Sequence, residues 1–488
     1  MQLQLYNTLT KKQEMITGGD DKPLGFYACG ITAYDYAHIG NLRRYVMDDV
    51  ILRTLRYDGY QVKHVQNVTD VGHLTSDADT GEDKLEKGAK REQQSVTAIA
   101  RKFEEYFYQA SSEIGNRHPD VVTRATEYID QQLKIAIALE EKGFAYLIPG
   151  DGLYFDTSKF ADYGALAGHD LAKLKEGARI EKVAGKRNPT DFAVWKLEKP
   201  GENRQMVWPS PWGERSFPGW HLECVAMSID QLGPSVDLHS GGVDHIPVHH
   251  TNEIAQAEAY TGVKPFVKVW IHHNFMRVDG KKMSKSLGNI YRLEDITAKG
   301  FSPMALRYLF LTSHYRSELN FTWESMAAAD KAYQRLLANL ILFDSEKEYS
   351  MATEDHMDKA EAYRLKFLTA INDDLDTPRA LAIINEIFKS NLGRRERYDL
   401  VIELDNVLGL DLRRQAQLQK QKTQLEVTLQ PDGEAQRLLA ERETARANRD
   451  FARADYLRQR IESMGYQVID GPDGAQVKKK HDDHSRTS

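Results

Sequence analysis

The chain has 488 residues, 41% of them hydrophobic and 28% charged, and carries a formal net charge of −7. This length exceeds one hydrophobic core and predicts about three domains, while the composition is that of an ordinary globular protein. No apolar run reaches the roughly 20 residues of a membrane span, and the first residues lack the apolar stretch of a secretory signal, so we expect a cytoplasmic protein with no membrane partner.

The first elements in chain order predict a strand–helix–strand unit. Residues 24–29 form a short apolar run typical of a buried parallel strand, and apolar positions between 42 and 55 recur at helical spacing until Gly59 ends the helix. A second strand is predicted over residues 60–68. Such units build a doubly wound parallel sheet of the Rossmann type. The charged, glycine-containing segment 72–92 is expected to be an exposed loop.

A small module is predicted to interrupt this sheet from about residue 126 to about 208. A helix over 126–142 precedes a hairpin over 144–157, which turns around residues 149–152. The α/β pattern then resumes with a short strand at 235–238, a helix from about His249 and a strand over 267–275. We therefore predict an α/β domain over residues 1–302.

The rest of the chain is predicted to be mainly helical. A helical bundle should cover residues 303–420, with a clear helix start where Asp376 precedes Pro378. Residues 415–430 are rich in Gln and Lys and are interpreted as a linker. A small mixed α/β module with a terminal hairpin is predicted over 431–480, and the polar tail 481–488 is expected to be disordered.

A phosphate-binding turn is predicted at His38-Ile39-Gly40-Asn41, where the first helix begins. A helix N-terminus offers free backbone N–H groups and a positive dipole end. His38 can donate one more hydrogen bond, and Gly40 lets a ligand approach the backbone closely. Taken alone, this tetrapeptide is more often a capped helix start with a surface histidine.

A lysine loop, Lys282-Met283-Ser284-Lys285-Ser286, follows the strand predicted over 267–275. Two lysines flanking a small flexible loop suit a clamp on a polyphosphate, where they neutralise charge on the α-phosphate and the leaving pyrophosphate. The common alternative is a solvated basic loop. Combined with residues 38–41, however, the pentapeptide resembles the second of the two signature sequences of class I aminoacyl-tRNA synthetases.

The chain has two cysteines, Cys29 and Cys224, whose usual meaning is a pair of inert buried thiols. His249 and Glu253 are four residues apart and would share one face of a helix. Two thiolates, an imidazole and a carboxylate make a suitable zinc coordination sphere. The spacing does not show that they meet, and His250 competes with His249 as the imidazole ligand.

Longer stretches resemble cysteinyl-tRNA synthetases, in the same order and from about residue 5 to about 478. They are FYACGITAYDYAHIGN, NVTDVGH, DFAVWK, WPSPWGE, FPGWHLECVAMS, HHTNEIAQAEA, GKKMSKSLGN and the terminal RANRDFARADYLRQRIESMGYQVIDGPDG. Three positions depart from the commoner family pattern: Asn41 ends the phosphate turn in place of histidine, and Ser240 and Thr251 replace Gly and Glu. None of these positions is a predicted metal ligand.

The resemblance implies a catalytic domain over residues 1–302, a stem-contact region and helical bundle over 303–420, and an anticodon-binding module over 431–480. It also implies a role for each matching residue. The implied roles are zinc ligands for Cys29, Cys224, His249 and Glu253; cysteine-pocket positions for Thr69 and Trp220, with both thiolates beside the substrate; catalytic ATP-site positions for His38, Asn41, Lys282 and Lys285; nucleotide contacts for Gly40, Ser284, Ser286 and Lys285; and anticodon contacts for Arg446, Asp455 and Asp470. Arginines and carboxylates can read splayed base edges, although residues 434–480 carry only ten Lys and Arg against eight Asp and Glu.

The implied activity is ATP-dependent ligation of L-cysteine to tRNA(Cys) through cysteinyl-adenylate, by a monomer that holds one Zn²⁺ and uses ATP with Mg²⁺. Zinc would bind the substrate thiolate and so reject serine, which pocket size alone discriminates poorly. Two alternatives stay open. One is a cysteine ligase paralogue that acts on a small amine acceptor, and the other is a non-catalytic tRNA-binding relic.

Overall fold

The computed structural model describes residues 2–18, 22–72, 85–86, 88–89, 94–168, 184–344, 354–429, 433–471 and 474–479. Most of the predicted loop 72–92 and the whole tail 481–488 lie outside these residues. The chain divides into two compact units, Met1–Leu412 and Arg413–Ser488. Among the described helices, none combines the length and the apolar character that crossing a membrane requires.

A five-stranded parallel sheet forms the centre of the first unit, in the order β12-β11-β3-β4-β5. The strands are β3 Leu24–Thr32, β4 Val62–Thr69, β5 Val121–Arg124, β11 Val236–Gly242 and β12 Val267–His273. The strand order reverses beside β3, because β4 lies on one side of it and β11 on the other. In doubly wound sheets a ligand crevice opens at this switch point. The predicted fold class is confirmed.

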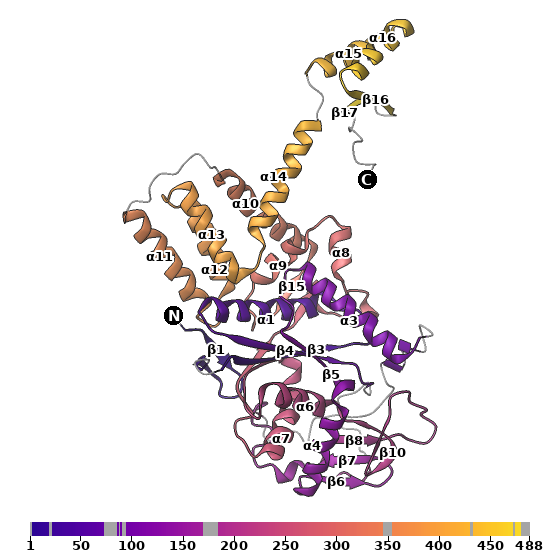
Figure 1. The fold of residues 1–488 in the computed structure, drawn as a ribbon, viewed down its shortest axis with the longest axis vertical. Helices are drawn as coiled ribbons and strands as arrows, with labels where there is room; N and C mark the ends of the chain where they lie inside the picture. Colours follow the sequence, from indigo (N-terminus) through magenta and orange to yellow (C-terminus); the bar gives the residue numbers. More distant parts are fainter. Residues whose placement is uncertain are drawn as a thin grey trace, which may run out of the picture. The chain divides into compact units, whose positions relative to one another are not determined.

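Helices cover both faces of this sheet (Figure 1). The helices α1 Ile39–Tyr57 and α3 Val96–Glu113 lie along one face, and α4 Ile129–Glu141, α6 Trp220–Leu232 and α7 His249–Thr261 lie toward the other. Strand side chains such as those of Phe26, Leu238 and Trp270 are fully buried between the two layers. The core therefore holds the carboxyl ends of the strands in fixed register.

A second sheet, antiparallel and in the order β6-β7-β8-β10-β9, is inserted between β5 and α6. Its strands are β6 Ala145–Ile148, β7 Gly152–Phe155, β8 Phe192–Leu197, β9 Trp208–Ser210 and β10 Gly213–Pro218. The first two strands form the hairpin predicted over 144–157. The last two lie at and beyond residue 208, so the sheet continues to Pro218, directly before α6.

Two short pieces of sheet flank the central one. The hairpin β1 Gln4–Asn7 and β2 Lys12–Met15 packs beside β12, and a three-stranded sheet has the order β14-β13-β15. Its strands are β13 Met276–Val278, β14 Lys281–Lys282 and β15 Leu319–Phe321. Because β14 ends at Lys282, this small sheet holds the base of the lysine loop.

The helices that follow form a bundle, and two of them pack against α1. These helices are α8 Leu293–Ala298, α9 Pro303–Leu311, α10 Trp323–Phe343, α11 Glu354–Ile371, α12 Thr377–Lys389 and α13 Arg394–Leu408, of which α9 and α13 contact α1. Single 3-10 turns occur earlier in the chain, at η1 Ala125–Tyr128, η2 Thr157–Lys159, η3 Val243–His245 and η4 Lys285–Leu287. As predicted, α12 starts where Asp376 caps the helix, its side chain accepting a hydrogen bond from the backbone of Arg379.

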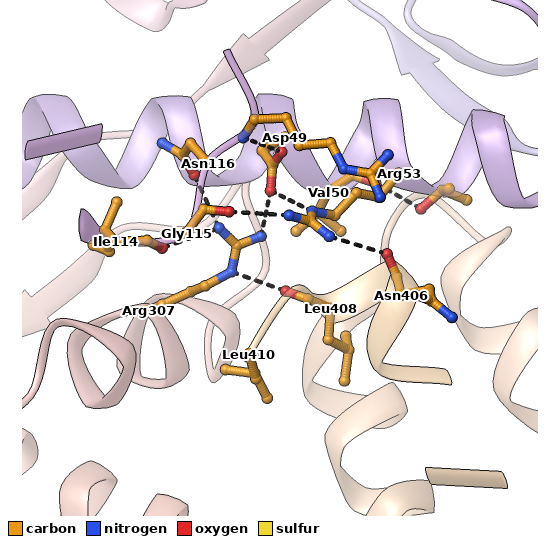
Figure 2. Close-up of polar contacts among 12 residues, drawn as sticks. Asp49, Val50, Arg53, Ile114, Gly115, Asn116, Arg307, Asn406, Leu408 and Leu410 are labelled. Atoms are coloured by element: carbon orange, nitrogen blue, oxygen red, sulfur yellow. Dashed lines mark hydrogen bonds and ion pairs between the residues drawn. The ribbon is translucent and has the colours of Figure 1, made fainter. Parts of the chain in front are cut away.

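A buried polar cluster joins α1, α9 and α13 (Figure 2). The Arg307 guanidinium, on α9, bonds the Asp49 carboxylate at 2.5 Å and donates to the Leu408 carbonyl at 2.9 Å. Arg53 bonds the same carboxylate at 2.6 Å. Gly409 ends α13 in the left-handed conformation (φ 65°), and a Cβ there would meet both guanidinium groups. Only glycine fits this position without displacing the two arginines.

The second unit begins with α14 Leu412–Leu429, whose first residue belongs to the first unit. It continues with α15 Gly433–Ala447, α16 Phe451–Ser463 and the antiparallel pair β16 Tyr466–Gly471 and β17 Gly474–Lys479. The two helices α15 and α16 pack on each other and on the strand pair. The predicted linker over 415–430 is wrong as far as Leu429, since α14 runs through it. Gln, Lys, Leu and Arg are strong helix formers, and no glycine or proline interrupts them before Pro431.

Candidate active site and metal centre

A cavity of about 1150 Å³ opens at the carboxyl ends of the parallel strands. Its wall includes Gly30 of β3, Gly242 of β11 and His273 of β12, together with the start of α1 and part of the lysine loop. This is the switch-point crevice that the sheet order requires. The phosphate turn and the lysine loop, far apart in the sequence, therefore face the same space.

His38 and Asn41 hold the phosphate turn by capping each other. The backbone N–H of Asn41 donates to Nδ1 of His38 (3.2 Å), and the backbone N–H of His38 donates to the Asn41 side-chain oxygen (3.0 Å). Burial lowers the pKa of His38, so the ring is neutral at pH 7. Because Nδ1 accepts, the proton is on Nε2, which is available to donate to a ligand.

The lysine loop lies directly on this turn. A Cβ added to Gly40 would come within 2.2 Å of the Met283 methyl group, so a larger residue here would displace the end of the Met283 side chain. The loop is braced from within, because the Ser284 backbone N–H donates to Asn289 (2.9 Å) and the Ser284 and Ser286 hydroxyls are 3.1 Å apart. Lys282 lines the cavity. The backbone of Lys285 begins η4, and its side chain lies outside the description.

The four predicted metal ligands converge. Cys29 comes from β3, Cys224 from α6, and His249 and Glu253 from α7; one donor atom of each lies within 4.8 Å of the others, and all four side chains are buried. His249 Nε2 is 2.9 Å from Oε1 of Glu253, yet among the described residues Oε1 has no hydrogen-bond partner of suitable geometry. An orphaned buried carboxylate oxygen between two thiols and an imidazole fits a bound metal ion.

His250 takes part in a second possible set, with Cys29, His239 and Glu253. Its Nε2 is 3.3 Å from the Cys29 sulfur, and its Nδ1 is bonded to His272 at 2.8 Å. Both sets satisfy proximity, but the set with His249 contains two sulfur donors and the other contains one. Soft thiolates favour zinc, so the chemistry of the donors favours His249.

The electrostatics of the cluster suit a cation. Burial alone would raise the pKa of the Cys29 thiol, but the neighbouring Cys224 sulfur holds it well below its usual range. Burial likewise opposes ionisation of Glu253, and the imidazoles of His239 and His249 outweigh it and lower the pKa of Glu253 to about 2. A thiolate and a carboxylate are thus already present as metal-binding forms.

The two predicted cysteine-pocket residues lie in different places. Trp220 lines the cavity, and its ring centroid is 4.4 Å from that of His249. Thr69 is buried and donates to the carboxylate of Glu223 at 3.0 Å, next to Cys224 in sequence. The structure also brings Arg44 to the cavity wall. Sequence reasoning missed Arg44, although its position one turn after Asn41 placed it near the phosphate turn.

Comparison with known proteins identifies the family of the chain. The family described as "tRNA synthetases class I (C) catalytic domain" matches residues 15–331. Cysteine–tRNA ligase of Treponema denticola is 41% identical over 483 residues, covering 95% of this chain and 97% of that protein. Cysteine–tRNA ligase 1 of Burkholderia lata is 43% identical over 478 residues, covering 98% and 97%. The chain belongs to the cysteine–tRNA ligase family. It is a class I aminoacyl-tRNA synthetase.

The fold of this ligase is also similar to a solved structure, Mycobacterium tuberculosis methionyl-tRNA synthetase in complex with methionyl-adenylate. The TM-score is 0.56 at 15% identity, covering 80% of this chain and 90% of that one. At this identity the likeness concerns the fold alone.

The second unit of the ligase matches "Cysteinyl-tRNA ligase anticodon binding domain" over residues 431–477. Of its three predicted anticodon contacts, Arg446 and Asp470 lie together, with Nη1 2.8 Å from Oδ1. Arg442 also bonds Asp470, at 2.9 Å, and this contact lowers the pKa of the carboxyl group. Asp455 is exposed on α16.

Proposed function

We propose that this ligase joins L-cysteine to tRNA(Cys) in two steps, through cysteinyl-adenylate. The observation that carries the proposal is the convergence of Cys29, Cys224, His249 and Glu253 next to two residues of the cavity wall, Gly30 and Trp220. A buried set of sulfur, imidazole and carboxylate donors fits Zn²⁺. When bound there, the zinc ion supplies a soft partner for the substrate thiolate, which a serine hydroxyl cannot match.

The residues of the turn and loop bind and orient ATP for the first step. In that step a carboxylate oxygen of cysteine bonds to the α-phosphorus, the bond from that phosphorus to the bridging oxygen breaks, and pyrophosphate leaves with the electron pair. The step needs positioning and charge neutralisation more than proton transfer. His38 donates from Nε2, Asn41 fixes the ring, and Lys282 and Lys285 neutralise the phosphates. Mg²⁺ accompanies the nucleotide.

The proposed role of the small residues around the nucleotide is to let it come close to the protein backbone. Gly40 leaves the turn open, and Ser284 and Ser286 brace the loop that carries the lysines. Thr69 and Trp220 shape the cysteine pocket, Thr69 through the carboxylate of Glu223.

In the second step a ribose hydroxyl of the terminal adenosine attacks the acyl carbon, and AMP leaves. The small second unit selects the tRNA. Its exposed Arg446, Asp455 and Asp470 supply donors and acceptors for base edges. Arg442 and Arg446 both donate to Asp470, and this cluster supports the role. A base that replaces one of these contacts would form a hydrogen bond to a charged group, which is stronger than one between neutral groups.

The test is charging of unfractionated tRNA with labelled cysteine, with ATP and Mg²⁺, before and after removal of zinc by a chelator. Cysteine-specific charging that falls on zinc removal and returns on zinc addition supports the proposal. Comparable charging with serine contradicts the zinc-based selection. Cysteine-dependent pyrophosphate exchange without any charging points instead to a paralogue that acts on a small amine, and the absence of both points to a tRNA-binding relic.

A further inference from the structure

Arg44 lies on α1 between the phosphate turn and the metal ligands. Asn41, Arg44 and Asp48 follow each other at spacings of three and four residues, so they share one face of the helix. The side chain of Arg44 is 13% exposed, and the residue lines the large cavity. A buried cation needs a close anionic partner, and the ion pair that Arg44 forms among the described residues is a long one, 3.6 Å to Asp48.

The contacts of Arg44 leave part of its guanidinium unused. Its Nη2 donates to the backbone carbonyl of Cys29, and its Nε lies 3.6 Å from Oδ2 of Asp48. Among the described residues, Nε has no hydrogen-bond partner. Asp48 is itself bonded to His273 at 2.8 Å. A guanidinium offers five N–H donors, so Arg44 is anchored at the Cys29 backbone and retains donors at the cavity wall.

The other arginines of the cavity wall are engaged differently. Arg277 forms a paired contact with the Glu318 carboxylate, with distances of 2.7 and 2.9 Å. The Arg292 guanidinium lies 3.9 Å from the centre of the Tyr36 ring. Arg44 is the one of the three that contacts the backbone of a predicted metal ligand.

We propose that Arg44 binds the α-carboxylate of the amino-acid substrate. The inference rests on the proposed function, which places the substrate sulfur at the metal ligands and its carboxylate at the phosphate turn. Cysteine is short, and these two ends are separated by three bonds of its skeleton. The carboxylate must therefore lie beside the Cys29 backbone, where the guanidinium is held. A fork of N–H donors matches a carboxylate in shape and charge.

The consequence is a division of labour within the pocket. The sulfur end of the substrate is recognised by the metal ligands, and the carboxylate end by Arg44, which also keeps the nucleophilic oxygen turned toward the phosphate turn. Arg44 is thus a substrate-binding residue. Its loss is expected to raise KM for cysteine about 10- to 100-fold, the range for a charged hydrogen bond.

The experiment compares L-cysteine with cysteamine, which has the thiol and the amine but no carboxylate. Cysteine-dependent pyrophosphate exchange is measured for the zinc-loaded full chain and for Arg44→Met and Arg44→Lys, with cysteamine as a competitive inhibitor. We expect KM for cysteine to rise in Arg44→Met and less in Arg44→Lys. The inhibition constant of cysteamine and KM for ATP should stay within about twofold.

Three results overturn the proposal. Equal losses for cysteine and cysteamine mean that Arg44 supports the metal ligands or the fold. A loss confined to ATP means that it binds phosphate, and an unchanged KM for cysteine means that it binds neither. If the unmodified chain shows no exchange, the proposed function fails. Calorimetric binding of cysteine and cysteamine then still tests Arg44, and Arg44→Lys keeps the test valid if Arg44→Met does not fold.

Discussion

Replacing Arg307 with leucine tests the buried polar cluster of Figure 2, where one guanidinium joins three segments of the first unit. Arg307 is fully buried, and Asp49 is 3% exposed. Leucine fills part of the volume but donates no hydrogen bond. The variant leaves Asp49 with one arginine partner, Arg53, and leaves the carbonyl oxygens of Ile114 and Leu408 without their donor.

The magnitude follows from what remains around Asp49. Breaking a buried ion pair costs about 3–5 kcal/mol. Asp49 keeps Arg53 at 2.6 Å and the backbone N–H of Arg117 at 3.0 Å, so the lower end of that range applies. The orphaned acceptors of Ile114 and Leu408 add about 1 kcal/mol each. We expect the free energy of unfolding of the first unit to fall by about 4–5 kcal/mol.

The assay is a urea titration followed by tryptophan fluorescence. All six tryptophans lie between Trp195 and Trp323, so this signal reports on the first unit. Arg395→Leu is the matched control, since Arg395 pairs with Asp399 on the surface of α13 and such pairs contribute little. Arg307→Lys should lose nearly as much free energy of unfolding as Arg307→Leu, because a lysine ammonium lacks the planar fork of N–H donors. A midpoint for Arg307→Leu equal to that of Arg395→Leu would refute the reasoning.

Three further predictions concern the site and its surroundings. Gly40→Ala places a Cβ 2.2 Å from the Met283 methyl, which would have to shift. Exchange turnover should therefore fall about two- to tenfold, the cost of an off-rotamer side chain, with KM for cysteine unchanged, and Met283→Ala in the same chain should restore part of it. No effect would mean that the loop does not rest on the turn during turnover. Cys224→Ser removes a soft ligand, so metal analysis should find zinc at well below one equivalent, whereas zinc retained at full occupancy contradicts the ligand set. Burial raises the pKa of Asp70 to about 6, above its ordinary value of 3.8. The folded state therefore binds this proton more tightly than the unfolded state, and stability falls as pH rises from about 4 to 6. Asp70→Asn should gain up to about 3 kcal/mol relative to the unmodified chain over this range, and urea titrations at several pH values that show no such gain would contradict the argument.

The elements found from the sequence are those with local signals. The strand at Leu24, the helix after His38 and the cap at Asp376 each show a periodicity or a start signal within a few residues. By contrast, α6 was not predicted. Its segment from His221 to Ser228 is buried all round between the sheet and α7, so the polar face that defines helical periodicity is missing.

The residues of the site were likewise predictable only where their relation is local in the sequence. That Cys29 and Cys224 meet depends on the packing of β3 against α6, which no spacing rule encodes. The i,i+4 spacing did place His249 and Glu253 together, because that relation is local. Composition misled at α14, where glutamine and lysine were interpreted as a linker although both favour helix.

The charges of α1 explain why Arg44 was missed. A cluster of charged residues on a helix usually marks the solvated face, yet Arg43, Asp48 and Asp49 are all buried, and Arg44 nearly so. Each has its own partner on a different element: Arg43 donates to backbone carbonyls around residues 274 and 314, Asp48 bonds His273, and Asp49 bonds Arg307.

Partners on several sides fix the rotation of α1 about its axis. Apolar packing alone tolerates small rotations of a helix, whereas turning a buried charge away from its partners costs several kcal/mol, about 3–5 for an ion pair. The N-terminus of this helix must present N–H groups to phosphate, and its middle must hold Arg44 at the Cys29 carbonyl. We infer that the buried charges are retained because they fix this orientation, at the end of α1 where the chemistry takes place.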